Sequence, residues 1–318
     1  MKKTSLFFAL LCAAAVLSFA SGKKEADELT IYGLKGPSGV GMIRLFETPP
    51  SIRGKQVSME ALASSDLMAA RFISGEAKVG VLPPNVAAKI AASGKSIQAA
   101  AVTGLGMLSL ISGDPSVKTI DDISGKSVAV AGQGAVPDYV FRKILTEHQI
   151  DPDTGVKLDY SLATPEIVQS LIAGRIELAV IPEPFATMAL QGNENLERVG
   201  DIQAEWEKYA GQGNYPITVL VLDAQFAKDN PDAVKTILAA VKDSIEWVTE
   251  NPSEAGDLVE KHGLGIKAAV AAAAIPYSNY TFIEAEAARP ALTALYETLL
   301  EFAPDSIGGK LPADSFYY

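Results

Sequence analysis

Short apolar runs of four to seven residues recur along most of the chain, and amphipathic stretches separate them. Apolar runs of this length, bounded by turn residues, predict buried strands, and the spacing between them is typical of amphipathic helices. The predicted strands are Leu29–Tyr32, Gln56–Met59, Lys78–Leu82, Ile97–Val102, Ser127–Ala131, Lys157–Tyr160, Leu178–Ile181 and Ile217–Leu222. The predicted helices between them include Asp66–Ile73, Asp138–Glu147 and Pro165–Ala173. This alternation predicts an α/β fold in which helices flank mostly parallel sheets.

The last third of the chain has a different pattern, because it is almost purely helical after Asp223. Asp232–Thr249 is a long amphipathic stretch, Ser253–Lys261 is a shorter one, and the alanine-rich Ile266–Ala274 stops before Pro276. Since this part has no predicted sheet of its own, its helices are expected to pack on a sheet formed by earlier residues.

An internal repeat is the most informative feature of the sequence. Residues 72–87 read FISGEAKVGVLPPNVA and residues 171–186 read LIAGRIELAVIPEPFA, with Ile, Gly, Val, Pro and Ala in matching places. Each copy reads as a helix end, a glycine turn, an apolar strand, a proline and a helix start. Upstream, residues 29–41 and 127–136 both run from a strand into a glycine-rich turn. The repeat therefore predicts two α/β lobes of similar plan.

Two breaks rich in glycine and proline, Ser112–Ser116 and Gly211–Pro216, flank the second copy. Such breaks suit crossings of the chain between lobes. The predicted layout is a first lobe made of residues 21–112 and 217–318, and a second lobe made of residues 113–216. This layout implies two hinges, at 112–116 and 211–217, and one cleft between the lobes.

The first twenty residues predict a secretory signal. Lys2 and Lys3 form a positive start, Leu6–Leu17 is apolar, and Ser18-Phe19-Ala20 supplies the small residues of a cleavage site after Ala20. The apolar run is shorter than the roughly 20 residues that a membrane span needs. The mature chain is therefore expected to start at Ser21 and to be exported, periplasmic or associated with the cell envelope.

The one cysteine of the sequence, Cys12, lies inside the predicted signal, so the mature chain is expected to have no disulfide and no thiolate ligand. A lipid anchor on Cys12 remains an alternative that the preceding Ala9-Leu10-Leu11 disfavours. The mature chain would carry 25 basic and 38 acidic residues, a net charge of −13. With no basic cluster after the first 24 residues, a nucleic-acid partner is not expected.

The signal, the Lys35–Gly39 turn, the glycine-strand-proline copies and the Glu183-Pro184-Phe185 segment together resemble the solute-binding proteins of ABC importers. The likeness is to the branch with nitrate-, sulfonate-, taurine- and thiamine-precursor-binding members, and it spans the whole mature chain. This resemblance implies a two-lobed type II periplasmic-binding-protein fold that closes on a small ligand. It also implies delivery to an ABC permease in the inner membrane with its ATPase, without identifying the ligand.

In open α/β sheets, ligands bind beyond the carboxyl ends of the strands, where helix N-termini expose unpaired N–H groups. Four turns of the first lobe and three of the second meet this condition. The candidate ligand-binding residues are Lys35, Gly36, Ser38, Ser64, Ser65, Pro84, Asn85, Thr103, Gln133, Gly134, Ala135, Thr164 and Glu183, with Tyr215 from the second break. Helix capping alone explains Ser, Thr and Asn at such places equally well, so this alternative stays open for each of them.

Catalytic, metal and cofactor motifs find little support in the sequence. The glycine-rich turns lack the full dinucleotide fingerprint and a Walker A ending, and there is no GxSxG or HExxH motif. The two histidines, His148 and His262, each lie in a polar stretch near the end of a predicted helix. We therefore expect no catalytic residue, no metal and no cofactor.

The predicted function is an exported solute-binding protein that captures a small molecule by hinge closure. A same-fold enzyme acting on a small heterocyclic or carboxylate substrate is the first alternative, and the absence of a mature cysteine argues against it. A periplasmic ligand-sensing module that docks on a membrane receptor is the second alternative, and the sequence does not separate it from the importer component.

The charges of the candidate turns predict the kind of ligand. These turns contain no arginine, Lys35 is their only cation, and Asp66 and Glu183 are acidic. The expected ligand is neutral, zwitterionic or a compact planar heterocycle, with an amine or ring N–H that donates to Glu183. The alternative is an anion held by helix N-termini near Ser38, Gly39 and Gly134.

Overall fold

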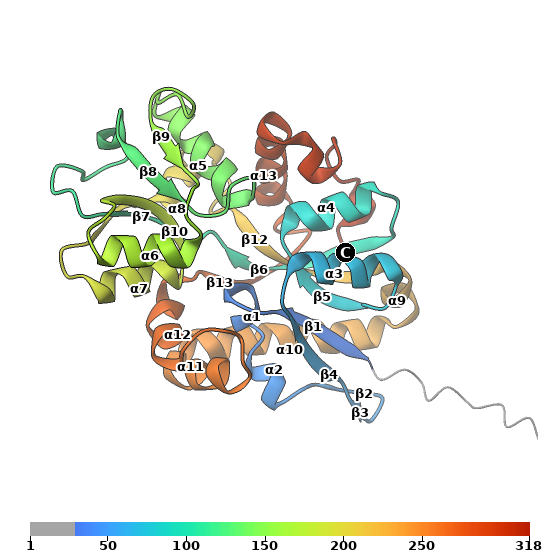
Figure 1. Ribbon diagram of the computed structural model, residues 1–318. Coiled ribbons are helices and arrows are strands. Elements are labelled where there is room, and N and C mark those ends of the chain that lie inside the picture. The colour runs from blue at the N-terminus through green and yellow to red at the C-terminus, as the bar shows by residue number, and fades with distance from the viewer. Residues whose placement is uncertain (1–28) are drawn as a thin grey trace, which may run out of the picture.

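The computed structural model describes residues 29–318, which form two lobes, each built on its own sheet (Figure 1). The predicted signal and its cleavage site lie outside the described residues. The first sheet has the order β13-β6-β12-β5-β1-β4, and the second has the order β11-β7-β10-β8-β9. The first-lobe strands are β1 (Thr30–Leu34), β4 (Ser58–Leu62), β5 (Val79–Leu82), β6 (Ile97–Leu105), β12 (Pro216–Asp223) and β13 (Tyr280–Glu284), beside a small hairpin of β2 (Ser51–Ile52) and β3 (Lys55–Gln56). The second-lobe strands are β7 (Leu108–Ser112), β8 (Ser127–Val130), β9 (Lys157–Asp159), β10 (Leu178–Pro182) and β11 (Glu197–Asp201).

Each of the two sheets has three neighbouring parallel strands, arranged in the same way. In the first lobe β1 lies between β4 and β5, with Ile31 opposite both Met59 and Val79. In the second lobe β8 lies between β9 and β10, with Ala129 opposite both Asp159 and Ala179. The repeated sequence segments are β5 and β10 with the helices around them. The α/β fold predicted from the alternation and the repeat is thus confirmed.

Strands that run antiparallel to these triplets connect the lobes. β12 lies beside β5 in the first sheet, and β7 lies beside β10 in the second. The chain leaves the first sheet after β6 and enters the second at β7, crossing at Gly106 and Met107. It returns through residues 211–215, after which β12 joins the first sheet. The two crossings touch, because the Gly106 N–H donates to the Tyr215 carbonyl oxygen at 2.8 Å.

The first lobe boundary drawn from the sequence needs correction. Leu108–Ser112 was assigned to the first lobe, but it forms β7 of the second sheet, so the crossing lies several residues before 112–116. Ser112 and Asp114 instead form a turn within the second lobe, where the Asp114 N–H donates to Ser112 Oγ at 3.0 Å. The run from β6 into β7 is apolar on both sides of Gly106, so the sequence carries no polar break at the crossing.

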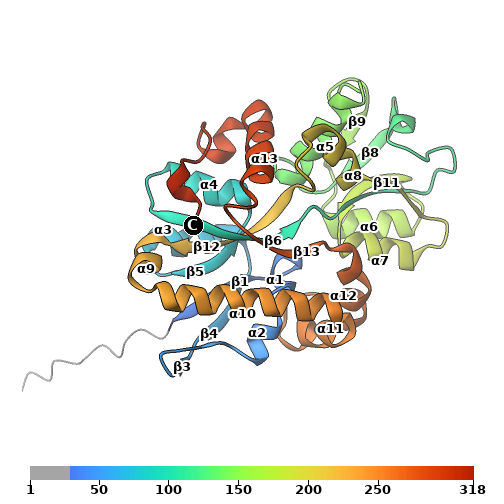
Figure 2. The same ribbon diagram turned by 180° about the vertical axis from the view of Figure 1, so that it is seen from behind.

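Helices cover both faces of each sheet, and this double coverage explains the continuous apolar runs of the central strands. The first-lobe helices are α1 (Pro37–Val40), α2 (Arg44–Glu47), α3 (Ser65–Ser74), α4 (Pro84–Ala92), α9 (Ala224–Asp229), α10 (Pro231–Glu250), α11 (Pro252–Lys261), α12 (Ala268–Ala274) and α13 (Arg289–Phe302). The second-lobe helices are α5 (Val136–Glu147), α6 (Thr164–Ile172), α7 (Phe185–Gly192) and α8 (Ile202–Ala210). Helix α10 runs along one face of the first sheet, opposite α3 and α4 (Figure 2). Within residues 29–318 no helix is both long and apolar enough to cross a membrane.

The helical last third contains one strand that its sequence does not reveal. β13 follows α12 and pairs antiparallel with β6, at the edge of the first sheet. Its residues are only partly buried, so they show neither a continuous apolar run nor a clear alternation. The same is true of β11 at the edge of the second sheet. Edge strands with mixed exposure are the elements that hydrophobic periodicity detects least well.

Candidate functional site

A cavity of about 320 Å³ lies between the two lobes and is the candidate binding site. The first lobe contributes Pro37, Ser38, Ser65, Pro83, Asn85, Val86 and Ile217 to its lining. The second lobe contributes Leu108, Gly134, Ala135, Val136, Pro137 and Pro182, and the crossings contribute Met107 and Tyr215. We call this cavity the interlobe pocket. Its volume is at the small end of the range usual for ligand sites.

The fold brings these residues together because parallel strands end at the pocket. β1, β4 and β5 of the first lobe and β8 and β10 of the second each run into a turn that supplies lining residues. Helices α3, α4 and α5 begin at this edge, with Ser65, Pro84 and Val136 as their first residues. The pocket therefore lies beyond the carboxyl ends of the strands, where ligands of open α/β sheets bind.

The structure brings six of the fourteen candidate residues into the lining of this pocket and leaves eight outside it. The six are Ser38, Ser65, Asn85, Gly134, Ala135 and Tyr215. The eight are Lys35, Gly36, Ser64, Pro84, Thr103, Gln133, Thr164 and Glu183. Capping explains Ser64, whose Oγ accepts from the Leu67 N–H at 3.3 Å as the N-cap of α3. Thr103 is buried in the first sheet with its hydroxyl against the Thr218 carbonyl oxygen at 3.5 Å.

Both carboxylate oxygens of Glu183 accept hydrogen bonds from other groups of the protein. This changes the prediction of ligand charge that the sequence of the turns suggested. Glu183 is buried, its Oε1 accepts from Arg198 Nη2 at 2.7 Å, and its Oε2 accepts from the Thr187 N–H at 3.1 Å. Arg198 lies on β11, which the sequence pattern does not predict, and for this reason no arginine was expected near this turn. The expected hydrogen bond from a ligand amine to Glu183 is therefore not supported by this geometry.

Two backbone groups suggested as anion donors are also occupied. The Gly39 N–H donates to the Gly36 carbonyl oxygen at 3.2 Å, and the Gly134 N–H donates to Asp138 Oδ2 at 2.9 Å. Ser38 Oγ accepts from Thr218 Oγ1 at 3.2 Å. An anion would have to compete with these internal partners.

Asp138 is a residue of the site region that the sequence analysis missed. Its carboxylate is buried at the start of α5 and accepts three hydrogen bonds, from the Gly134 N–H, from Tyr160 Oη at 2.6 Å and from Arg142 Nε at 3.1 Å. Burial and the hydrogen bond to Asp138 raise the pKa of Tyr160, which keeps its hydroxyl a donor. Asp138 thus holds the glycine-rich turn that forms the second-lobe wall of the pocket. The sequence did carry a signal for this role. Asp138 is the third residue of a helix that follows a glycine-rich turn, a position from which an acidic side chain can accept hydrogen bonds from the backbone N–H groups of the turn.

Replacing Asp138 by asparagine is expected to loosen this turn. The amide group of asparagine offers one acceptor oxygen to three converging donors, and a buried donor without a partner costs about 1–3 kcal/mol. Hydrogen exchange at the Gly134 amide should therefore become faster. Asp122→Asn is the matched control, because Asp122 also accepts backbone N–H bonds in the second lobe, but away from the pocket. Equal exchange rates at Gly134 in Asp138→Asn and in the unmodified protein would contradict this role of Asp138.

The lining of the interlobe pocket contains no charged side chain among the residues that the structure describes. Prolines, aliphatic side chains and Met107 form most of it, and Ser38, Ser65 and Asn85 supply polar groups on the first-lobe side. The Tyr215 hydroxyl donates to Gln203 Oε1 at 3.1 Å, and burial raises the pKa of Tyr215. Residues 29–318 contain no group of three or more side chains placed to hold a metal ion. Such a lining suits a small solute with apolar faces and a few hydrogen-bonding atoms.

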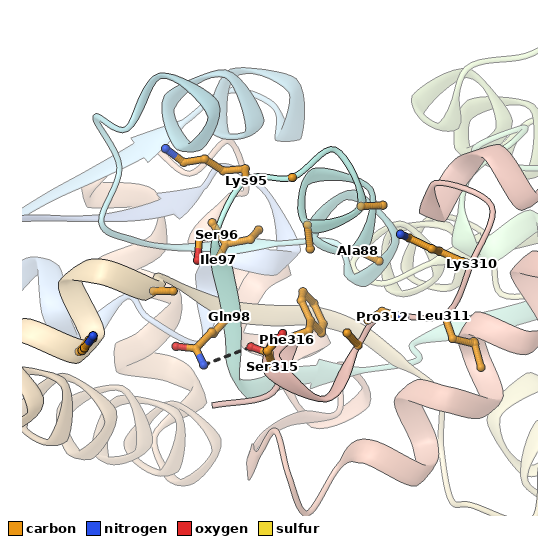
Figure 3. Close-up of a pocket in the computed structure, with 16 residues that line it drawn as sticks. Ala88, Lys95, Ser96, Ile97, Gln98, Lys310, Leu311, Pro312, Ser315 and Phe316 are labelled. Atoms are coloured by element: carbon orange, nitrogen blue, oxygen red, sulfur yellow. Dashed lines mark hydrogen bonds between the residues drawn. The ribbon is translucent and has the colours of Figure 1, made fainter.

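A cavity of about 490 Å³ between α4, the start of β6 and the C-terminal segment belongs to the first lobe alone (Figure 3). Gln98 and Ser315 are joined across one side of it, with Gln98 Nε2 donating to the Ser315 carbonyl oxygen at 3.2 Å. It lies at the amino end of β6, away from the edge where both lobes meet. Movement of the lobes would not enclose a ligand there.

Comparisons with known proteins agree with this geometry. A model of the NMT1-like family matches residues 50–261. The crystal structure of an ABC transporter from Parabacteroides distasonis superposes with a TM-score of 0.79 and 25% identity, covering 91% of this chain and 98% of that one. The periplasmic aliphatic sulphonate binding protein SsuA from Escherichia coli superposes with a TM-score of 0.70 and 16% identity, covering 91% of each chain. These matches confirm the two-lobed binding-protein fold implied by the resemblance.

One curated relative matches a shorter stretch. YtlA of Bacillus subtilis (strain 168), assigned by its name to binding proteins, is 25% identical over 133 residues. The match covers 42% of this chain, and it spans little more than a third, 37%, of the length of YtlA.

Proposed function

Because the chain belongs to the NMT1-like family, we propose that it is the solute-binding component of an ABC import system and holds a small organic solute between its lobes. The observation that carries this proposal is the interlobe pocket, which both lobes line at the carboxyl ends of their parallel strands. The related proteins support the same reading, since their names describe ABC transporter and binding proteins.

The mechanism rests on the two crossings of the chain. Residues 106–107 and 211–215 are the covalent connections between the sheets, so rotation about them changes the distance between the pocket walls without unfolding either lobe. Ala135 and Val136 would approach Ser65 and Asn85 as the lobes close into the present arrangement, in which both lobes line the pocket, and this closed form would be presented to a membrane permease. The predicted signal and the periplasmic location of SsuA support export of the chain.

The pocket favours an uncharged solute. No charged side chain is found in its described lining, and burying an isolated charge is costly without a partner. Glu183 and Arg198 neutralise each other beside it, so neither supplies a free charge. The helix N-termini of α3 and α4 still favour hydrogen-bond acceptors, which suits carbonyl oxygens or ring nitrogens of the solute. A compact neutral heterocycle with acceptor atoms fits these features best.

Mass spectrometry of small molecules released from freshly purified, denatured protein tests the proposed function directly. We expect one organic species in a ratio approaching one per chain. Protein purified without any bound species, and unaffected in stability by a broad library of periplasmic nutrients, would contradict a solute-binding role.

The charge class of the solute is tested by thermal shift and calorimetry against matched panels. Neutral heterocycles such as aminopyrimidines are expected to raise the melting temperature, because ligand bound only by the native state stabilises it. Nitrate, taurine and alkanesulfonates are expected to have no effect at the same concentrations. Tight binding of an alkanesulfonate would show that the uncharged class is wrong while leaving the solute-binding role intact.

A further inference from the structure

A second cavity between the lobes, of about 530 Å³, adjoins the interlobe pocket and shares Leu108 with it. Arg198 of the second lobe and Tyr277 of the first both line this cavity. The guanidinium carbon of Arg198 lies 4.8 Å from the centre of the Tyr277 ring. This contact joins the two lobes outside the pocket that the proposed function uses.

Arg198 is fixed on the second-lobe side by two partners. Its Nη2 donates to the fully buried Glu183 at 2.7 Å, and its Nη1 donates to Ser109 Oγ. Glu183 follows β10, Ser109 belongs to β7 and Arg198 to β11, so all three belong to the second lobe. Movement of the lobes would therefore leave this group intact and change only what lies against the outer face of the guanidinium.

Tyr277 is the first-lobe part of the contact. It ends the short 3-10 helix Ile275–Tyr277 after α12 and lies just before β13 of the first sheet. Tyr277 is 55% exposed, so its contact with Arg198 is partly open to solvent. Helices α12 and α7 also pack against each other across the lobes (Figures 1 and 2).

We propose that Arg198 and Tyr277 form a clasp that stabilises the present arrangement of the lobes, in which the interlobe pocket is walled from both sides. The ring face of tyrosine attracts a cation, and Glu183 with Ser109 holds the guanidinium in place for it. The clasp does not touch the solute. It raises the fraction of molecules in the lobe arrangement that binds solute, and the apparent affinity rises with that fraction. Its effect on affinity rests on the proposed function, whereas its effect on lobe arrangement does not.

The first experiment measures the distance between the lobes without solute. A chain starting at Ser21 has no cysteine, so labels can be placed at Lys157→Cys in β9 and Lys235→Cys in α10, both exposed and on different lobes. In double electron–electron resonance, Tyr277→Ala is expected to broaden and shift the distance distribution. Tyr277→Phe keeps the ring face and is expected to leave the distribution unchanged.

Tyr318→Ala is the control, because Tyr318 is a similarly exposed first-lobe tyrosine at the other end of the sheet, paired through its backbone to Ala99. It should behave as the unmodified protein does. If Tyr277→Ala gives the same distribution as Tyr277→Phe, the clasp does not hold the lobes and the proposal is overturned.

The second experiment compares the copurified solute, or a member of the aminopyrimidine panel that binds, across the same variants. Affinity is expected to fall on the order of fivefold in Tyr277→Ala, consistent with loss of one partly exposed cation–aromatic contact, and to be restored in Tyr277→Phe. A higher affinity in Tyr277→Ala would show that the clasp stabilises an arrangement of the lobes that does not bind solute, and this would overturn the proposal. If no variant binds any solute, the distance measurement still decides the clasp, while the proposed function fails separately.

Discussion

An Ala135→Trp variant is expected to lose almost all solute binding while keeping its fold. Ala135 is the N-cap of α5 and lines the interlobe pocket from the second lobe. An indole ring at this position would fill a large part of a 320 Å³ cavity and keep the lobes from closing on a solute. Losing about 120 Å² of apolar contact costs about 3 kcal/mol, which is a factor of about 100 in affinity.

Ala163→Trp is the matched control. Ala163 is the N-cap of α6 in the same lobe, and a proline stands two residues after it, as one does after Ala135. Unlike Ala135, it is exposed and lies outside the pocket. After removal of bound solute, both variants should unfold at the denaturant concentration of the solute-free unmodified protein, and only Ala135→Trp should be purified without solute. Retention of solute by Ala135→Trp at the level of Ala163→Trp would place the solute elsewhere.

A Glu183→Gln variant is expected to lose about 2 kcal/mol of unfolding free energy, because it removes the carboxylate partner of Arg198. Removal of one member of a buried ion pair usually costs 3–5 kcal/mol, and the partial exposure of Arg198 reduces this figure. The side chain of Arg198 is 27% exposed and that of Glu183 is 1% exposed. Glutamine retains an oxygen for the Thr187 N–H, so the measured loss reports on the ion pair. The measurement is guanidinium unfolding followed by far-ultraviolet circular dichroism.

The neighbouring ion pair of β11 supplies the comparison. Glu197 pairs with Lys118 at 2.5 Å, but both side chains are more than half exposed, so Glu197→Gln should change the unfolding free energy by less than about 1 kcal/mol. Equal stability of Glu183→Gln and Glu197→Gln would mean that the buried pair contributes nothing beyond an exposed one. A loss of solute binding in Glu183→Gln larger than the loss in Tyr277→Ala would return Glu183 to the ligand contacts proposed from the sequence, because loosening of Arg198 alone should cost no more than loss of its aromatic partner.

The sequence by itself determined the plan of the fold. The repeated segments at 72–87 and 171–186 each bury a central strand between helices, and local apolar runs are enough to reveal such strands. The turns that follow the predicted parallel strands also pointed to Ser38, Ser65, Asn85, Gly134 and Ala135, because a turn after a parallel strand must lie at the carboxyl edge of its sheet.

Only the tertiary structure decided which polar groups are free at that edge. Glu183 meets Arg198 through the pairing of β10 and β11 with β7, and the Gly134 N–H meets Asp138 through the geometry of the α5 start. The first crossing at Gly106 carried no polar break, and the edge strands β11 and β13 carried no periodicity. Hydrophobic pattern records whether a residue is buried, whereas the partner of a buried charge depends on residues brought together from distant parts of the chain. That difference is why the sequence alone pointed to part of the pocket lining but not to its charge.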